Sequence, residues 1–138
     1  MVSPRRPFAV TAVAVLQALL GVLFLLGVVA LTVAGFRLSE VVPHVRFFAV
    51  RLFVVVIVLF VLAVVEFVLA YGLWTRLSWA WKFSLAFAVV GIVFFTFSVF
   101  LRPGFGEIAS LIIDVLILYY LMQPQVQAYF KKDAATPP

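Results

Sequence analysis

The sequence contains no cysteine, a single histidine and only five acidic residues among its 138 positions. Without cysteine the chain has no disulfide bonds, iron–sulfur clusters, thiolate metal sites or thiol redox chemistry. One histidine, His44, rules out a bis-histidine haem, and as a lone loop residue it is expected to be solvated. Charged residues make up 11% of the chain, against roughly 25% in a soluble domain. A water-soluble core is therefore not expected.

Apolar residues, in contrast, make up 67% of the chain and occur in long runs separated by short charged or Pro- and Gly-containing breaks. Cutting the chain at these breaks leaves four segments, at residues 8–35, 47–73, 82–101 and 106–122. Each could cross the roughly 30 Å apolar core of a bilayer as a helix. Short connections favour antiparallel neighbours. The sequence thus predicts one all-α domain over residues 1–138, an integral membrane antiparallel four-helix bundle with short flexible polar ends at 1–7 and 131–138.

The net charge of +5 comes from basic residues that stand singly or in pairs between the apolar segments. This distribution is typical of topology signals and of contacts with anionic lipid headgroups, and not of a nucleic-acid-binding patch. With four spans both termini share one side of the membrane, which would hold six basic residues: Arg5, Arg6, Arg76, Lys82, Lys131 and Lys132. The other side would hold four: Arg37, Arg46, Arg51 and Arg102. This bias predicts cytoplasmic termini in the cell membrane.

The tryptophan and tyrosine residues all fall on the side of the termini in this topology. Six of them flank the apolar segments and are expected to anchor the helix ends in the headgroup layer: Tyr71, Trp74, Trp79, Trp81, Tyr119 and Tyr120. Such a belt fixes the depth of the helices, but it does not distinguish inside from outside.

Polar side chains within the apolar segments are the candidates for chemistry. Counted from the terminus-side ends of their segments, Glu66 lies roughly 9 Å deep, Asp114 roughly 12 Å and Gln17 roughly 13 Å. Ser110 precedes Asp114 by one helical turn and could hydrogen-bond to it. The sequence therefore predicts a polar layer of Gln17, Glu66, Ser110 and Asp114. Because no basic residue is expected at this depth, both acids are expected to be protonated.

Two interpretations of the polar layer remain open. In the first, the protonated acids hydrogen-bond to Gln17, Ser110 or backbone carbonyls and hold the helices together. In the second, Glu66 and Asp114 share a proton or exchange it for a cation. The first is preferred because polar contacts between membrane helices are common and the sequence shows no route from the layer to either face.

No motif of a nucleotide-binding protein, a serine hydrolase or a zinc protease occurs in the chain. A Ser-His-Asp arrangement would need His44 and Asp114, which the predicted topology separates by about half a bilayer. We therefore expect no enzymatic activity, no metal and no cofactor.

Four phenylalanines recur near one face of the third segment at helical spacing: Phe83, Phe87, Phe94 and Phe97. Such a stripe predicts a face that packs against other helices, with a dedicated apolar ligand groove as the less favoured alternative.

The C-terminal half carries three short patterns: Tyr71-Gly72-Leu73-Trp74, then Trp79-Ala80-Trp81, then a tail from Tyr119 to Phe130 that reads YYL-x-x-P-x-V-x-x-YF. In these patterns the chain resembles a group of small four-helix membrane proteins of archaea and bacteria. The resemblance implies a topology and helix boundaries, and it implies neither an activity nor site residues.

Together these features favour an accessory, assembly or structural subunit that acts through helix–helix and lipid contacts. Its expected partners are membrane lipids and other membrane subunits or a second copy of the chain, and not nucleic acid. The alternative is a small proton- or cation-coupled transporter, or a channel-forming oligomer, that uses Glu66 and Asp114.

Overall fold

The computed structural model describes residues 5–41 and 46–135, and all its regular structure in these ranges is helical. Five helices follow one another along the chain: α1 (Phe8–Val41), α2 (Arg46–Trp74), α3 (Ser78–Leu101), α4 (Phe105–Leu121) and α5 (Pro124–Ala135). The all-α prediction is confirmed for this part of the chain. His44 lies outside the described residues, as do 1–4 and 136–138 of the ends predicted to be flexible.

Three of the helices are long and apolar enough to cross a membrane by themselves, over Phe8–Leu38, Phe47–Trp74 and Ser78–Leu101. The fourth, α4, has only 17 residues. It meets α5 at a bend of 65°, and the two together pass the same test as a broken span. The described chain thus holds three candidate spans, or four if α4 and α5 form one.

Two boundaries of the four predicted helices differ from the prediction by more than one residue. Helix α1 continues to Val41 and so carries Arg37 and Glu40 past the predicted end at residue 35. A helix does not have to end where it leaves the apolar layer, because its backbone hydrogen bonds are internal. Helix α3 begins at Ser78, four residues before the predicted start at Lys82.

The tail from Pro124 forms a helix of 12 residues. Proline ends α4 because it cannot continue the hydrogen-bond ladder, but at the first position of a helix its missing N–H costs nothing. Helix α5 begins at Pro124 and runs to Ala135, so it extends into the segment 131–138 predicted to be flexible.

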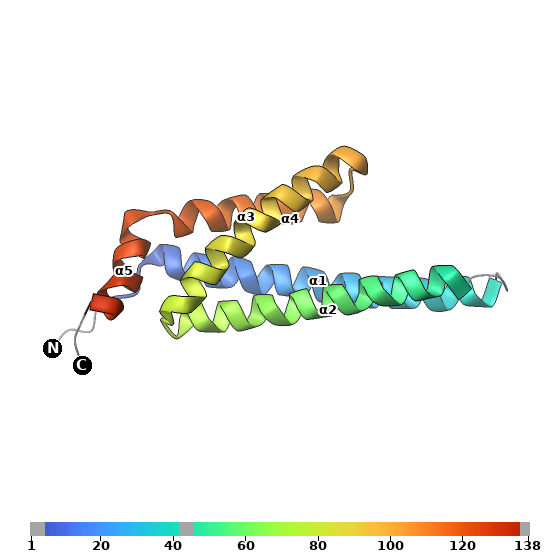
Figure 1. Cartoon of the computed structure of the whole chain (residues 1–138), viewed down its shortest axis with the longest axis horizontal. Helices are drawn as coiled ribbons and strands as arrows, with labels where there is room; N and C mark the ends of the chain where they lie inside the picture. Colours follow the sequence, from blue (N-terminus) through green and yellow to red (C-terminus); the bar gives the residue numbers. More distant parts are fainter. Residues whose placement is uncertain (1–4, 42–45, 136–138) are drawn as a thin grey trace.

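Figure 1 shows how the helices are arranged. Helices α1 and α2 lie side by side along their whole length, and α3 and α4 form a second, shorter hairpin that diverges from the first. Helix α5 folds across the end where α1 begins and α4 ends. The two hairpins therefore meet at one end of the molecule and separate at the other.

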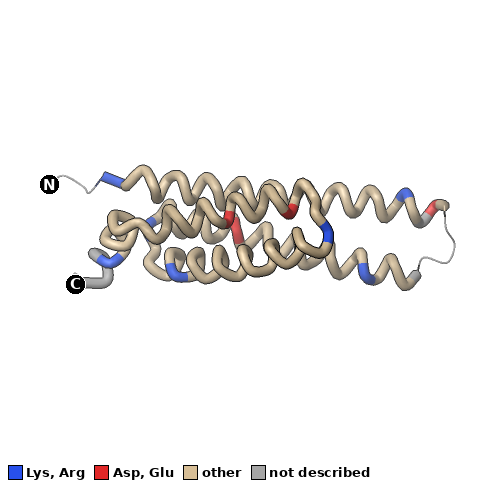
Figure 2. Tube along the Cα trace, turned by 90° about the horizontal axis from the view of Figure 1, so that it is seen from above, with Lys and Arg blue, Asp and Glu red and all other residues tan. Residues whose placement is uncertain are grey.

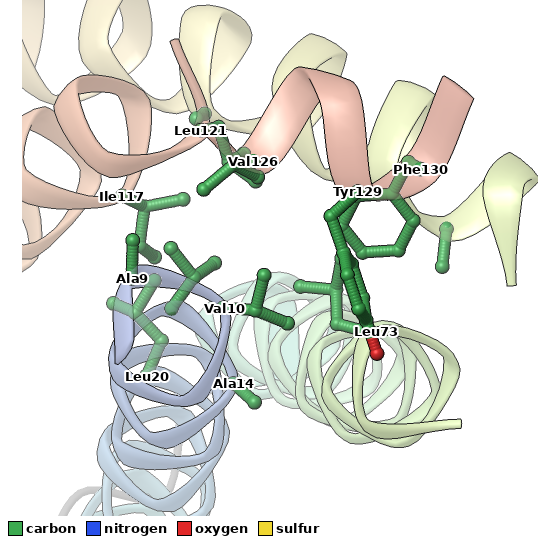
Figure 3. Packing of buried hydrophobic residues seen from close by; sticks show 13 residues of the cluster. Ala9, Val10, Ala14, Leu20, Leu73, Ile117, Leu121, Val126, Tyr129 and Phe130 are labelled. Carbon is green, nitrogen blue, oxygen red and sulfur yellow. The ribbon is translucent and has the colours of Figure 1, made fainter. Parts of the chain in front are cut away.

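Every buried side chain among the described residues lies at the end where the hairpins meet. We call this part the packed half; it consists of residues 8–24, 63–74, 78–88, 110–121 and 124–135. Its core includes Val10, Leu73, Ile117 and Leu121, and Figure 3 shows Val126, Tyr129 and Phe130 of α5 closing it. We call residues 25–41, 46–62, 89–101 and 105–109 the open half.

Small residues, and not the phenylalanines, form the packed face of α3. Ala80, Ser84 and Ala88 are fully buried at a spacing of four residues, whereas Phe94 and Phe97 are 63% and 69% exposed. The prediction of a packed phenylalanine face is wrong. In lipid, burial of a large apolar side chain between helices offers little gain over contact with acyl chains, so close approach through small residues decides the packing.

The turn between α2 and α3 is tightened by an unusual backbone conformation at Arg76, whose φ is 67°. Leu77 N–H donates to the carbonyl of Gly72 at 2.8 Å and closes the turn. A left-handed conformation at a non-glycine residue costs of the order of 1 kcal/mol. The Arg76 guanidinium lies 4.3 Å from the centre of the Tyr129 ring, a cation–π contact large enough to offset that cost. Helix α5 therefore holds this turn.

Candidate functional site

The polar residues predicted from the sequence all lie inside the packed half. The buried polar side chains among the described residues are Gln17 of α1, Glu66 of α2, Ser84 of α3, and Ser110 and Asp114 of α4, each at most 6% exposed. All four helices of the two hairpins therefore contribute to the layer. Ser84 is the member that the sequence analysis missed.

Gln17 and Ser84 hydrogen-bond to each other across the contact between the two hairpins. The Gln17 amide Nε2 donates to Ser84 Oγ at 3.0 Å, and the hydroxyl lies 3.3 Å from Gln17 Oε1, to which it can donate in turn. A contact between Gln17 and one of the acids was one of the predicted alternatives, and the structure pairs Gln17 with Ser84 instead. The signal for Ser84 was its place between Ala80 and Ala88, on a stripe of small residues at helical spacing.

Glu66 and Asp114 form the second part of the layer. Glu66 lies on α2 and Asp114 on α4, and both side chains are buried. Glu66 Oε2 is buried and has no hydrogen-bond partner in the described part of the chain. A buried oxygen without a hydrogen bond carries the free-energy cost of its lost hydration, and no new hydrogen bond offsets that cost. This orphaned oxygen is the most unusual polar atom of the site.

Asp114 occupies a space that α3 leaves free at Gly91. A Cβ atom added at Gly91 would lie 2.9 Å from Asp114 Cγ and would collide with Oδ2. Any side chain at this position would therefore displace the carboxyl group. Gly91 continues the small-residue stripe of α3 and belongs to the site, although the sequence analysis did not include it.

Among the described residues, basic groups lie away from the level of the two acids. Figure 2 shows the described Lys and Arg residues toward the ends of the helices, whereas acidic residues occur both midway along the molecule and at its far end. Within the described ranges, no three His, Asp or Glu side chains are grouped so that they could hold a metal ion. The chemistry available to the pair is therefore that of two carboxyl groups without a counter-charge.

The six expected interfacial aromatics separate into two kinds. Tyr71, Trp74 and Tyr119 are at least half exposed and Trp79 is 42% exposed at the end of the bundle, where they could reach headgroups. Trp81 and Tyr120 instead pack against the core. Trp81 Nε1–H donates to the carbonyl of Leu121 at 3.3 Å and so joins α3 to α4. The ring of Trp74 also carries the Arg6 guanidinium at 4.1 Å.

Residues 43–124, more than half of the chain, match the model of a family described as "Predicted membrane protein (DUF2127)". The chain belongs to the DUF2127 family. The DUF2127 region contains α2, α3 and α4, and with them Glu66, Ser84, Gly91 and Asp114, whereas Gln17 lies outside it. This protein is thus a membrane protein, in agreement with the resemblance seen in its sequence. No curated protein and no solved structure matches the chain.

Proposed function

We propose that this protein is a four-span membrane protein with cytoplasmic termini, and that it is an accessory or assembly subunit. In this proposal its open half binds a transmembrane helix of another membrane protein, while the packed half keeps the two hairpins together. The bent pair α4–α5 serves as the fourth span. No catalytic step is required.

The proposal rests on a groove in the open half. It has a volume of about 560 Å³ and lies along α3, where it is lined by Val90, Val93, Phe94, Phe97 and Leu101 among others. These side chains are apolar and exposed, and they occur where α3 diverges from the α1–α2 hairpin (Figure 1). A second helix could fill this space with the knob-and-groove contacts that stabilise membrane helix pairs.

Unequal hairpin lengths support the same function. The apolar stretch Phe47–Trp74 of α2 has 28 residues, about 42 Å of helix, whereas the 17 residues of α4 extend only about 26 Å. The far part of α1 and α2 therefore has no α4 beside it. A partner helix in the groove would lie next to this uncovered part.

Photo-cross-linking tests the proposal directly. A photoreactive amino acid at Phe97 is expected to form a discrete adduct with one membrane protein in native membranes. The control is the same residue at Phe53, an equally exposed position of α2 in the open half, where lipid contact should give no discrete protein adduct. An adduct whose mass is twice 15.4 kDa would assign the groove to a second copy. Lipid adducts alone at Phe97 would overturn the proposal.

The orientation can be tested separately, because the chain has no natural cysteine. We expect Leu77→Cys, in the α2–α3 turn, to react with a membrane-impermeant thiol reagent only from the cytoplasmic side. Pro103→Cys, between α3 and α4, should react only from the opposite side. Labelling of both from one side would contradict a four-span topology.

The second candidate function is proton- or cation-coupled transport, or conduction by an oligomer, through Glu66 and Asp114. The buried, unpartnered Oε2 of Glu66 favours it. A transport path would have to reach the acids, however, and neither this groove nor the smaller one beside Ala14 and Tyr71 is lined by them. Purified protein in liposomes should therefore show no acid-dependent proton flux. A flux that is lost in both Glu66→Gln and Asp114→Asn would favour the second function over the first.

A further inference from the structure

We propose that the smaller groove, between α1 and α2 in the packed half, binds one anionic phospholipid. An acyl chain lies against its alanines, and the headgroup phosphate binds Arg6. The groove has a volume of about 270 Å³ and is lined by Ala14, Val15, Ala18, Ala70, Tyr71 and Trp74. This site is separate from the groove along α3 and does not depend on the proposed partner helix.

The sizes of the lining side chains account for the groove. Each helix contributes two alanines or one alanine together with larger residues at positions i, i+1 and i+4, which share one side of a helix. Ala14 is buried, whereas Val15, Tyr71 and Trp74 are at least half exposed. The volume lies just below the roughly 300–1,000 Å³ of typical small-molecule pockets. The groove is therefore suited to part of one acyl chain and is too small for a helix.

The groove runs from the helix ends into the apolar part of the bundle. Tyr71 and Trp74 lie in the last turn of α2, which ends at Trp74. Ala14 and Ala18 lie six and ten residues beyond the start of α1 at Phe8, roughly 9 and 15 Å along the helix. A phospholipid has the same order, with its headgroup at the level of the helix ends and its acyl chains deeper.

Arg6 is held at the outer end of the groove by two contacts with Trp74. Its guanidinium carbon lies 4.1 Å from the centre of the Trp74 ring, and its Nη2 donates to the Trp74 carbonyl at 2.7 Å. This hydrogen bond uses one of the five N–H donors of the guanidinium. A planar guanidinium held in place is well suited to bind a phosphate, which accepts two parallel N–H donors.

The charges around the groove favour a headgroup with a net negative charge. The start of α1, the α2–α3 turn and α5 meet at this end of the molecule (Figure 1). Their described basic residues are Arg5, Arg6, Arg76, Lys82 and Lys131, and Asp133 of α5 is the acidic residue in these segments. The choline group of a zwitterionic lipid needs an aromatic face or an acid, but Arg6 occupies a face of Trp74. An anionic phospholipid is therefore preferred.

Native mass spectrometry of the purified protein in detergent tests the site, by titration with dioleoyl-phosphatidylglycerol or dioleoyl-phosphatidylcholine. One phosphatidylglycerol is expected to bind per chain, more tightly than phosphatidylcholine with the same acyl chains. Arg6→Gln should weaken this binding about tenfold or more, because a hydrogen bond to a charged group is lost. The control Arg37→Gln removes an exposed arginine at the opposite end of α1 and should change the affinity by less than about twofold.

A second variant keeps Arg6 and its contacts with Trp74, which Arg6→Gln removes. Ala18→Leu places a larger side chain in the groove and should also weaken the binding of phosphatidylglycerol, because the acyl chain loses its place. The matched control is Ala30→Leu, at an exposed position of the same helix in the open half, and it should bind the lipid as the unaltered protein does.

Equal affinity for the two lipids would overturn the proposal, as would unchanged binding of phosphatidylglycerol in either Arg6→Gln or Ala18→Leu. An excess of inorganic phosphate is expected not to displace the lipid, because the acyl chain contributes to its binding. Displacement by inorganic phosphate would assign Arg6 to a free anion and contradict the proposal.

Discussion

The packed half and the open half are both built from apolar sequence, and they differ in the side chains that α3 turns toward the other helices. In the packed half, α3 and α2 approach each other through small residues such as Ala80, Ala88 and Gly72. In the open half, α3 presents valine and phenylalanine outward, and the α3–α4 hairpin diverges from the α1–α2 hairpin (Figure 1). Apolarity therefore does not decide which membrane helices pack; close approach and polar contacts do.

Polar groups follow the same division. The Gln17–Ser84 contact between the hairpins, the Trp81 contact with Leu121 within the α3–α4 hairpin and the two buried acids all lie in the packed half. Helix α5 covers the same end (Figure 3). Matched substitutions in the two halves should therefore change the free energy of unfolding by different amounts.

The largest difference is expected for truncation of a large side chain. Leu73 is fully buried in the packed half, so Leu73→Ala should leave a cavity and lower the free energy of unfolding by about 2–4 kcal/mol. Leu101→Ala, at an exposed position of the open half, should change it by less than about 0.5 kcal/mol. Unfolding of both variants by SDS in mixed micelles measures the two values. Equal losses would remove the basis for the division.

A smaller difference is expected when a methyl group is added. A Cβ at Gly72 would lie 2.6 Å from the Cβ of Ala80, so Gly72→Ala must push α2 and α3 apart, at a cost of about 1–3 kcal/mol. At Gly27 the nearest side-chain atom, Leu59 Cδ1, would be 3.5 Å away, an ordinary contact. Gly27→Ala should be neutral or slightly stabilising, because alanine favours the helix. The same unfolding assay should rank the two variants in this order, and the reverse order would refute the packing described here.

The smallest difference concerns one hydroxyl group. Ser84→Ala removes the partner of Gln17, and a hydrogen bond between membrane helices contributes about 0.6 kcal/mol on average. In the open half, Ser98 Oγ donates at 3.0 Å to the carbonyl of Phe94 within its own helix. Ser98→Ala should therefore leave the stability unchanged. The unfolding assay should therefore show a larger loss of stability for Ser84→Ala than for Ser98→Ala. Equal losses would show that the Gln17–Ser84 contact does not hold the hairpins together.

Helix positions could be predicted from the sequence because charge and proline interrupt the apolar runs. The start of α1 at Phe8 agrees with the prediction, and α2 differs from it by one residue at each end. The start of α3 was misplaced because Lys82 looked like the edge of the apolar segment. Helix α3 begins before Lys82, so that Ala80 is part of the helix and packs against Gly72.

The polar layer could be predicted in part. Glu66, Asp114 and Gln17 stand out because polar residues are rare in apolar segments, and simple depth counting placed them at one level. Ser84 and Gly91 do not stand out, since serine and glycine are common in membrane helices. Which partner each polar group takes depends on the rotation and crossing of the helices, and no count along a single chain contains that information.

Distances between spin labels on α2 and α3 test the division between the halves most directly, and the chain has no natural cysteine to interfere. One pair of cysteines replaces Val68 and Phe83 in the packed half, and the other replaces Phe53 and Phe97 in the open half; all four positions are exposed. In lipid bilayers we expect a narrow, single-peaked distance distribution for the packed-half pair and a broader one for the open-half pair. Distributions of equal width, or a broader one in the packed half, would contradict the account.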